Sequence, residues 1–177
     1  MSVGLRDTAP AVDLPDDEGQ QWRLSDHRGR PVVMIFHRHL ACLPCHEHAV
    51  AVSDRIAEFG DAAVALITFT RPRNLRGFRH RLGLAYSVLA DEDRAVYRAY
   101  GLGRGRWWRV WSVGTMRAYG RLLRAGHRPT VPEGDTLQLG GDFVIDPCGR
   151  IAYAYRSTGP ADRPSVDDLL TAVRGCR

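Results

Sequence analysis

Two cysteines separated by two residues, Cys42 and Cys45, are the residues of this sequence most suited to chemistry. They follow an apolar run, Val32–Phe36, that predicts a buried strand, and Pro44 favours the first turn of a helix that begins there. Both sulfurs would then lie near the unpaired N–H groups at the positive end of that helix. Such a setting lowers the pKa of a thiol below its usual value of about 8.5. One cysteine can therefore attack and the other resolve, which predicts a dithiol/disulfide redox site.

Three other interpretations of the tetrapeptide remain open. The cysteines could be inert core residues, although a strand-to-helix junction flanked by His and Arg argues against this. Four histidines that suit a metal ion lie nearby: His37, His39, His46 and His48. A closed metal site usually needs a second ligand pair, however, and Cys148 and Cys176 do not form one. The segment from Cys42 to His46 also matches the short CxxCH haem-attachment pattern, which normally requires export. We expect neither a metal nor another cofactor.

The composition indicates one globular domain. The chain has 177 residues, of which 44% are hydrophobic and 25% charged, as is ordinary for soluble proteins. We predict a single domain over residues 1–177. No stretch resembles a signal peptide, and the longest apolar run is far too short to span a membrane. We therefore expect a cytoplasmic location without a membrane partner, where a close cysteine pair is redox-active rather than structural.

All 25 basic residues are arginine, and the formal net charge is +5. Five of these arginines cluster in one predicted helix: Arg71, Arg73, Arg76, Arg79 and Arg81. A single aromatic residue, Phe78, lies among them, in the apolar stripe of the predicted helix, and no known nucleic-acid motif surrounds them. The cluster predicts a solvated helix face, and we expect no nucleic-acid partner.

Strands and helices alternate along the predicted chain. A short hairpin is expected around residues 14–24, followed by strands at 32–36, 62–69, 86–89, 143–145 and 151–155. Helices are expected at 44–59, 71–82, 91–100 and 166–174. Asp91 is the expected N-cap of the third helix. This order predicts an α/β fold with a central mixed β-sheet flanked by helices on both faces.

An aromatic-rich segment at about 103–135 interrupts this order and predicts a helical insertion. It contains Trp107, Trp108 and Trp111. Large aromatic side chains of this kind usually fill a core or an interface. The insertion would therefore cover the active site or form a homodimer contact.

With these elements in order, the sequence resembles the peroxiredoxin-like (AhpC/TSA-type) family, in the branch that carries CxxC. After its first central strand that branch has an Arg, a small residue, CxxC and a Glu; these are Arg38, Ala41, Cys42, Cys45 and Glu47 here. Other matches are Ala9-Pro10, Leu14, Gly19, Leu24-Ser25, Gly29, Pro31, Val96-Tyr97, Tyr100-Gly101, Gly134-Asp135 and the two segments Leu137–Gly141 and Phe143–Asp146.

The resemblance implies a thioredoxin-like fold and an enzyme that uses the CxxC dithiol/disulfide to reduce hydroperoxides or disulfides. A thioredoxin- or glutathione-type reductant would restore the dithiol. Two alternatives stay open: a protein disulfide reductase without peroxidase activity, and a non-catalytic redox-sensing interaction protein.

The family pattern PxxxTxxC assigns roles in two ways. It places Cys45 in the slot of the attacking cysteine, Cys42 in the Thr slot and Arg38 in the Pro slot. In the peroxiredoxin version Cys45 attacks peroxide and Cys42 resolves. In the thioredoxin version Cys42 is the exposed nucleophile, and we favour it as first attacker on disulfides because it lies nearer the helix start. Arg38 would stabilise a thiolate or a developing oxyanion, so all three are predicted catalytic residues.

Two features of related families are missing. Peroxiredoxins place an Arg, and thioredoxins a cis-proline, just before the late strand pair, where this chain has Leu139-Gly140-Gly141. We expect Gly140 and Gly141 to let the backbone approach the CxxC closely. Glu47 is expected to be a solvated carboxylate or a partner of Arg38. Cys176, near a terminus expected to fray, is incidental or a distal resolving thiol.

Overall fold

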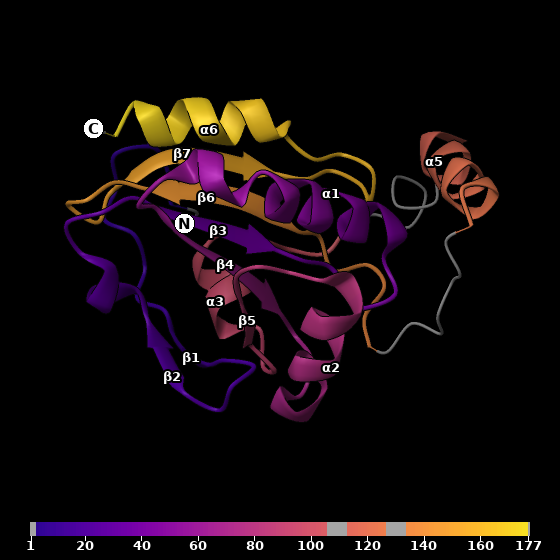
Figure 1. Cartoon of the computed structure of the whole chain (residues 1–177), viewed down its shortest axis with the longest axis horizontal. Coiled ribbons are helices and arrows are strands. Elements are labelled where there is room, and N and C mark those ends of the chain that lie inside the picture. Colours follow the sequence, from indigo (N-terminus) through magenta and orange to yellow (C-terminus); the bar gives the residue numbers. More distant parts are fainter. Residues whose placement is uncertain (1–2, 106–112, 127–133, 177) are drawn as a thin grey trace.

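The computed structural model describes residues 3–105, 113–126 and 134–176 (Figure 1). It begins with the expected hairpin, formed by β1 (Asp13–Pro15) and β2 (Gln21–Arg23). The Asp16 carboxylate accepts hydrogen bonds from two backbone N–H groups in the connecting turn, at 2.9 and 2.7 Å. A short 3₁₀ helix, η1 (Leu24–His27), follows.

A five-stranded mixed sheet forms the centre of the structure. Its strands are β3 (Val32–Phe36), β4 (Ala63–Thr68), β5 (Ser87–Ala90), β6 (Gly141–Ile145) and β7 (Ile151–Arg156). Their order is β5-β4-β3-β6-β7; β3, β4 and β5 are parallel, whereas β6 and β7 are antiparallel to their neighbours. Every residue of β3 is buried, which explains why this strand is apolar without alternation.

Helices cover both faces of the sheet, as predicted (Figure 1). Val33 and Ile35 of β3 face a core shared with α1 (Leu43–Asp54), α2 (Pro72–Leu82) and α6 (Val166–Arg174). The alternate β3 side chains face a second core, which contains α3 (Ala95–Ala99) and the β1–β2 hairpin. α1 ends one turn earlier than expected and continues as the 3₁₀ helix η2 (Ile56–Phe59).

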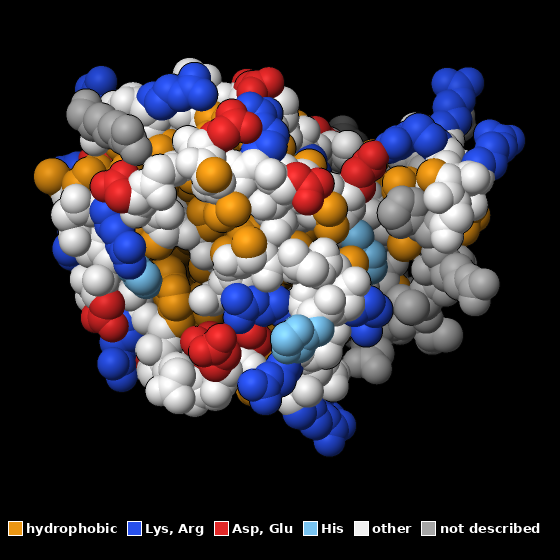
Figure 2. All heavy atoms as spheres, viewed as in Figure 1, with side chains coloured by type: hydrophobic (Ala, Val, Ile, Leu, Met, Phe, Trp, Pro, Cys, Tyr) orange, Lys and Arg blue, Asp and Glu red, His pale blue; other side chains and the backbone are white. Residues whose placement is uncertain are grey.

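The predicted insertion contains one described helix, α5 (Val113–Arg124), which packs against α1 at the edge of the molecule (Figure 1). Trp107, Trp108 and Trp111 lie outside the described residues. Basic side chains gather over α5 (Figure 2). Across the described ranges, no helix combines the length and apolar character needed to cross a bilayer. The single-domain organisation over residues 1–177 stays a prediction.

The arginine cluster lies on α2, largely on its exposed face. Arg79 differs from the other four because it reaches back to the β1–β2 hairpin, where its Nη1 lies 2.8 Å from Asp17 Oδ2 and 3.3 Å from Glu18 Oε1. The Asp17 carboxylate also accepts a hydrogen bond from the backbone N–H of Val88 in β5. One arginine of the cluster therefore ties the hairpin to the sheet.

The prediction that Asp91 caps the third helix is wrong. A turn closed by the hydrogen bond from Arg94 N to Asp91 O separates the two, and the helix begins at Ala95. Arg94, at the N-cap, has a φ of 60° in the left-handed region. The Asp91 carboxylate still accepts the N–H of Tyr97 at 3.0 Å, in the first helical turn. Asp91 therefore satisfies a helix donor from outside the cap position.

Phe143 offers a test of the core on the α3 face of the sheet. It is fully buried, with ring centroids 5.6 Å from Phe36 and 5.0 Å from Tyr100. Phe143→Ala should lower the free energy of unfolding by about 3–5 kcal/mol in urea titrations, because a cavity replaces the ring. Leu5→Ala is the control: Leu5 is 63% exposed, so its loss should cost no more than about 0.5 kcal/mol. Equal unfolding midpoints would contradict this account of the core.

Candidate active site

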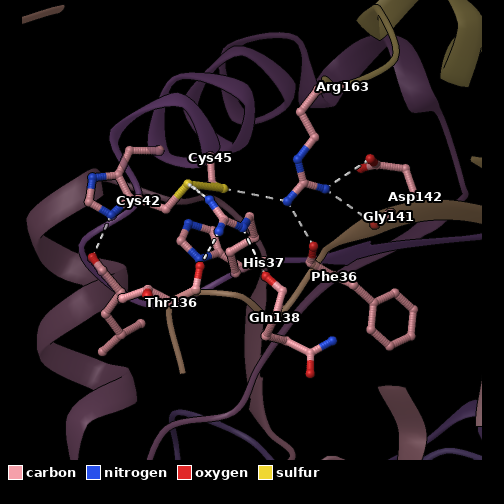
Figure 3. The surroundings of a disulfide bond; sticks show 12 residues. Phe36, His37, Cys42, Cys45, Thr136, Gln138, Gly141, Asp142 and Arg163 are labelled. Carbon is pink, nitrogen blue, oxygen red and sulfur yellow. Dashed lines mark hydrogen bonds and ion pairs between the residues drawn. A yellow bond between two sulfur atoms is a disulfide. The ribbon is translucent and has the colours of Figure 1, made fainter. Parts of the chain in front are cut away.

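The CxxC pair lies at the junction between β3 and α1 (Figure 3). Cys42 is the N-cap of α1, Pro44 is in its first turn, and the backbone N–H of His46 donates to Cys42 O at 3.0 Å. Cys42 and Cys45 form a disulfide, with Cα atoms 5.3 Å apart. The predicted position at the amino end of a helix is confirmed, with α1 starting at Leu43 rather than Pro44.

Neither cysteine is accessible in this oxidised form. Cys42 is 0% and Cys45 1% exposed, so the expectation that Cys42 is the exposed nucleophile is wrong for the disulfide state. α5 lies beside the pair and brings Tyr119 close to the Leu43 backbone and to Arg38. External molecules therefore reach the sulfurs only after a local rearrangement.

Arg38 lies where the resemblance placed it, beside the pair. It is 1% exposed, and its Nη1 is 3.8 Å from Cys42 Sγ. Its Nε donates to Gln138 O at 2.8 Å, and its Nη2 donates to Thr136 O. Burial lowers the pKa of Arg38 to about 10, so the side chain remains a cation at neutral pH. Arg38 thus holds a positive charge against one sulfur and anchors residues 136–138 to the site.

A second arginine, Arg163, contacts the other sulfur and was not predicted from the sequence (Figure 3). It comes from the loop between β7 and α6 and is almost completely buried. Its Nη2 donates to Phe36 O at 2.8 Å and lies 3.6 Å from Cys45 Sγ. Each sulfur of the disulfide therefore has its own guanidinium.

Gly140 makes room for this second arginine. A Cβ at this position would overlap both the Phe36 carbonyl oxygen and the Arg163 guanidinium. At Gly141 a Cβ would overlap Tyr155 O and Leu102. The glycine pair is closely packed, but against these groups and not against the CxxC pair that we expected. In the sequence, the signal for a second arginine was Gly140, which lies in the segment where peroxiredoxins place an Arg.

A buried carboxylate holds Arg163 in place. Asp142 of β6 is 0% exposed; its Oδ2 lies 3.0 Å from Arg163 Nη1, and its Oδ1 lies 2.8 Å from His48 Nε2. Burial alone would raise the pKa of Asp142, but the charges and hydrogen bonds of His48 and Arg163 outweigh it and lower the pKa. Asp142 is therefore ionised at neutral pH. An acidic residue inside an apolar strand was its only sequence signal.

Three of the four histidines near the pair, His37, His39 and His48, are buried. Burial, together with His46, Arg163 and His39, lowers the pKa of His37 well below its usual value. Burial and Arg38 lower the pKa of His39 to about 4. His37 packs its ring on His46 and Phe78, with centroids 5.4 and 5.3 Å away. His37 and His39 are therefore neutral at pH 7 and add no positive charge to the thiolates.

Glu47 does not pair with Arg38. Its two carboxylate oxygens accept hydrogen bonds from Arg121 of α5, both at 2.8 Å. This pair is exposed and fastens α5 to α1. Glu47 points away from the sulfurs because it follows Cys45 by two positions on the helix, on a different face.

The other two cysteines lie away from the pair. Cys148 is exposed in the turn between β6 and β7. Cys176 is half-buried and hydrogen-bonded to Ala172 O at 3.2 Å, so it is not frayed as expected, and burial raises its pKa. Arg163 lies just before α6 and Cys176 just after it, at the opposite end of the helix (Figure 1). No group of three His, Cys, Asp or Glu side chains within the described ranges could hold a metal ion.

A model of the AhpC/TSA family matches residues 5–154, most of the chain. The chain belongs to the AhpC/TSA family of peroxiredoxins. "Peroxiredoxin Bcp" of Escherichia coli is 31% identical to it over 151 residues, which cover 84% of this chain and 83% of the relative. "Putative peroxiredoxin Rv2521" of Mycobacterium tuberculosis is 29% identical over 158 residues, covering 86% and 87%.

Solved structures agree with the fold of this peroxiredoxin. Peroxidoxin BcpB from Mycobacterium tuberculosis matches with a TM-score of 0.71 at 22% identity, covering 98% of this chain and 97% of that one. A peroxiredoxin-like protein from Aquifex aeolicus gives 0.74 at 15% identity, covering 100% and 90%. The predicted thioredoxin-like fold and family are confirmed. This peroxiredoxin is a thiol peroxidase of the Bcp type with a CxxC pair.

The buried histidines predict how the stability of the peroxiredoxin depends on pH. In the unfolded chain His39 takes up a proton near pH 6.5, whereas in the folded protein it does so near pH 4. The free energy of unfolding should therefore fall as the pH drops from about 6.5 towards 4. With the disulfide kept intact, His39→Gln should make this slope shallower by up to about 1.4 kcal/mol per pH unit in urea titrations. A His39 ring resonance that titrates near pH 6.5 in NMR spectra would contradict the prediction.

Proposed function

We propose that Cys45 attacks the hydroperoxide, that Cys42 resolves the product, and that an external thiol then reduces the disulfide. The observation that carries this proposal is the joined pair of sulfurs at the start of α1, each with a guanidinium within 4 Å. A cation close to each sulfur and the positive end of a helix both favour the thiolate over the thiol. Both cysteines are thereby suited to attack or to leave.

Two observations support Cys45 as the attacking residue. The family pattern places the attacking cysteine at this position, and Cys42 takes the slot of the family's Thr. Arg163, which contacts Cys45, also lines a cavity of about 340 Å³, together with Pro44 and His48. Arg38, which contacts Cys42, is enclosed by backbone carbonyl groups instead. A peroxide in this cavity would contact the arginine of Cys45, although Cys45 itself is buried and does not line the cavity.

The proposed cycle has three steps. The Cys45 thiolate attacks the distal peroxide oxygen; the S–O bond forms, the O–O bond breaks, and the leaving alkoxide takes a proton to give an alcohol. The Cys42 thiolate then attacks the Cys45 sulfenic acid, which forms the disulfide and releases the oxygen as water after protonation. Two thiols of the reductant supply two electrons and two protons, restore the dithiol and become a disulfide themselves.

Arg38 acts in the second half of this cycle. During reduction of the disulfide one sulfur leaves as a thiolate, and a lower pKa of the leaving thiol speeds this step. Arg38 keeps its positive charge 3.8 Å from Cys42 Sγ, so it stabilises Cys42 when that sulfur attacks or leaves. This role fits a cation that is held by backbone carbonyls and not neutralised by a carboxylate.

The partners are proposed at the level of chemical class. The substrate is a hydroperoxide; a structurally similar relative, the bacterioferritin comigratory protein of Xanthomonas campestris, has an alkyl peroxide reduction activity. The reductant is a thiol of the thioredoxin or glutathione type. A homodimer stays a prediction, for which Met116 and Leu123 of α5 are large apolar residues with exposed side chains.

The cysteine roles can be tested by substitution. Cys45→Ser should abolish peroxide consumption driven by a thiol reductant. Cys42→Ser should still react once and leave a sulfenic acid on Cys45, which dimedone labelling and mass spectrometry would detect. Cys148→Ser, at an exposed turn position, is the control and should keep full activity.

Sustained peroxide turnover by Cys45→Ser, or dimedone labelling of Cys42 in that variant, would refute the assignment. Disulfide reduction by the parent protein without peroxide consumption would instead favour a disulfide reductase.

A further inference from the structure

We propose that Arg163 is a catalytic residue that stabilises the Cys45 thiolate and the departing peroxide oxygen, and that buried Asp142 and His48 position it. The inference rests on the proposed role of Cys45 as the attacking cysteine. It assigns a guanidinium beside Cys45 to the β7–α6 loop, whereas the segment before β6, where peroxiredoxins place an Arg, has glycines in this chain.

Arg163 places a guanidinium beside Cys45 in a chain that lacks the arginine of the segment before β6. The segment that carries the family arginine has Gly140 here, and a Cβ at this position would overlap the Arg163 guanidinium. The Arg163 side chain thus occupies the space that a side chain at position 140 would fill. A residue larger than glycine at position 140 would displace the guanidinium from Cys45.

The orientation of the Arg163 guanidinium is fixed by the central sheet. Its Nη2 donates to Phe36 O, at the end of β3, and its Nη1 lies 3.3 Å from Gly141 O, at the start of β6. Phe36 and Gly141 are paired in the sheet, so the rigid part of the fold aims the side chain at Cys45 Sγ. Figure 3 shows Arg163 between the disulfide and Asp142. Orientation of this kind is what makes a donor effective in a transition state.

A linear chain of polar contacts lies behind Arg163. Asp142 accepts from Arg163 with one carboxylate oxygen and from His48 with the other, at 3.0 and 2.8 Å. All three side chains come from different elements: the β7–α6 loop, β6 and α1. Asp142 and His48 do not contact the sulfurs in this arrangement; they set the position of the guanidinium that does. They are therefore positioning residues.

A cavity of about 340 Å³ beside α1 gives Arg163 access to a substrate. Arg163 and His48 line this cavity, and Arg163 also reaches Cys45. A hydroperoxide that reaches Cys45 through the cavity would pass the guanidinium. Its N–H groups can then donate to the thiolate before attack and to the oxygen that leaves when the O–O bond breaks.

Arg163 can be tested through the reactivity of Cys45 alone. In a Cys42→Ser background, the pH dependence of iodoacetamide alkylation gives the pKa of the Cys45 thiol. Arg163→Gln should raise this pKa by about 1 unit or more, so that alkylation at pH 6 becomes about tenfold slower. In the protein with both cysteines, the same substitution should lower kcat/KM for cumene hydroperoxide by about 100-fold or more.

A second variant covers the case in which Arg163→Gln does not fold. Arg163→Lys keeps the charge but loses the planar fork, so it should leave the Cys45 pKa near that of the parent and still lower kcat/KM. Arg76→Gln is the control, because Arg76 is exposed on α2 and does not line this cavity. It should change neither quantity.

The positioning role has its own signature. Asp142→Asn releases Arg163, so kcat/KM should fall about tenfold. The pKa of the Cys45 thiol should rise less than in Arg163→Gln, because the substitution also removes a negative charge near Cys45. His48→Gln should act in the same direction and less strongly. A kcat/KM that stays within about twofold of the parent in Asp142→Asn would overturn the positioning role of Asp142.

The outcomes separate this inference from the proposed function. The role of Arg163 is refuted if Arg163→Gln or Arg163→Lys leaves kcat/KM within about twofold of the parent and the Cys45 pKa within about 0.3 units, a twofold change in the acid dissociation constant. This holds even though Cys45→Ser is inactive. If Cys45→Ser keeps turning over peroxide, the proposed function fails, whatever Arg163 does to the Cys45 pKa.

Discussion

Two arginine cations are buried beside two sulfur atoms, and the rest of the site depends on keeping them there. A buried charge is costly unless hydrogen bonds or an opposite charge replace the lost water. Arg38 is satisfied by backbone carbonyls of residues 136 and 138. Arg163 donates to carbonyls of β3 and β6 and to the Asp142 carboxylate through its two Nη atoms, while its buried Nε has no hydrogen-bond partner among the described residues. Backbone carbonyl groups at one end of the central sheet therefore stabilise the two cations beside the CxxC pair.

The two arginines differ in how their charge is balanced. Asp142 sits behind Arg163 and shares its second oxygen with His48, so this guanidinium is held by an ion pair. Among the described residues, no carboxylate contacts Arg38 within ion-pair distance. The Cys42 sulfur therefore faces a cation held by neutral dipoles, and the Cys45 sulfur faces a cation oriented by a carboxylate. This asymmetry suits two cysteines with different tasks in one catalytic cycle.

The two buried cations also help to keep His37 and His39 neutral. His37 and His39 lie close to Arg38 and Arg163, and a further positive charge there would be repelled by both arginines. Burial and these cations keep both rings neutral at physiological pH. The positive charge around the disulfide is therefore carried by the two arginines and not by these histidines.

Local signals in the chain were enough to predict the order of strands and helices, the mixed sheet, the family and the place of the CxxC pair at the start of a helix. These signals are the apolar run of β3, Pro44 in the first turn of α1, and the turn residues between elements. Arg38 was within reach because it lies four residues before Cys42, in a segment that the family pattern covers. Asp91 was misplaced by one turn, since a left-handed residue at Arg94 delays the helix without changing the pattern.

Three features became apparent only in the folded chain. They are the Arg163 guanidinium beside Cys45, the Asp142 carboxylate behind it, and the pairing of Glu47 with α5. Arg163 is separated from Cys45 by most of the chain, and nothing near Asp142 in the sequence indicates that His48 and Arg163 lie against it. No local pattern encodes such contacts, because they arise where β3, β6 and the β7–α6 loop meet. Their main trace in the sequence is a glycine at the position where the family has an arginine. The packing of the strands shows that the Arg163 guanidinium fills the space that this glycine leaves.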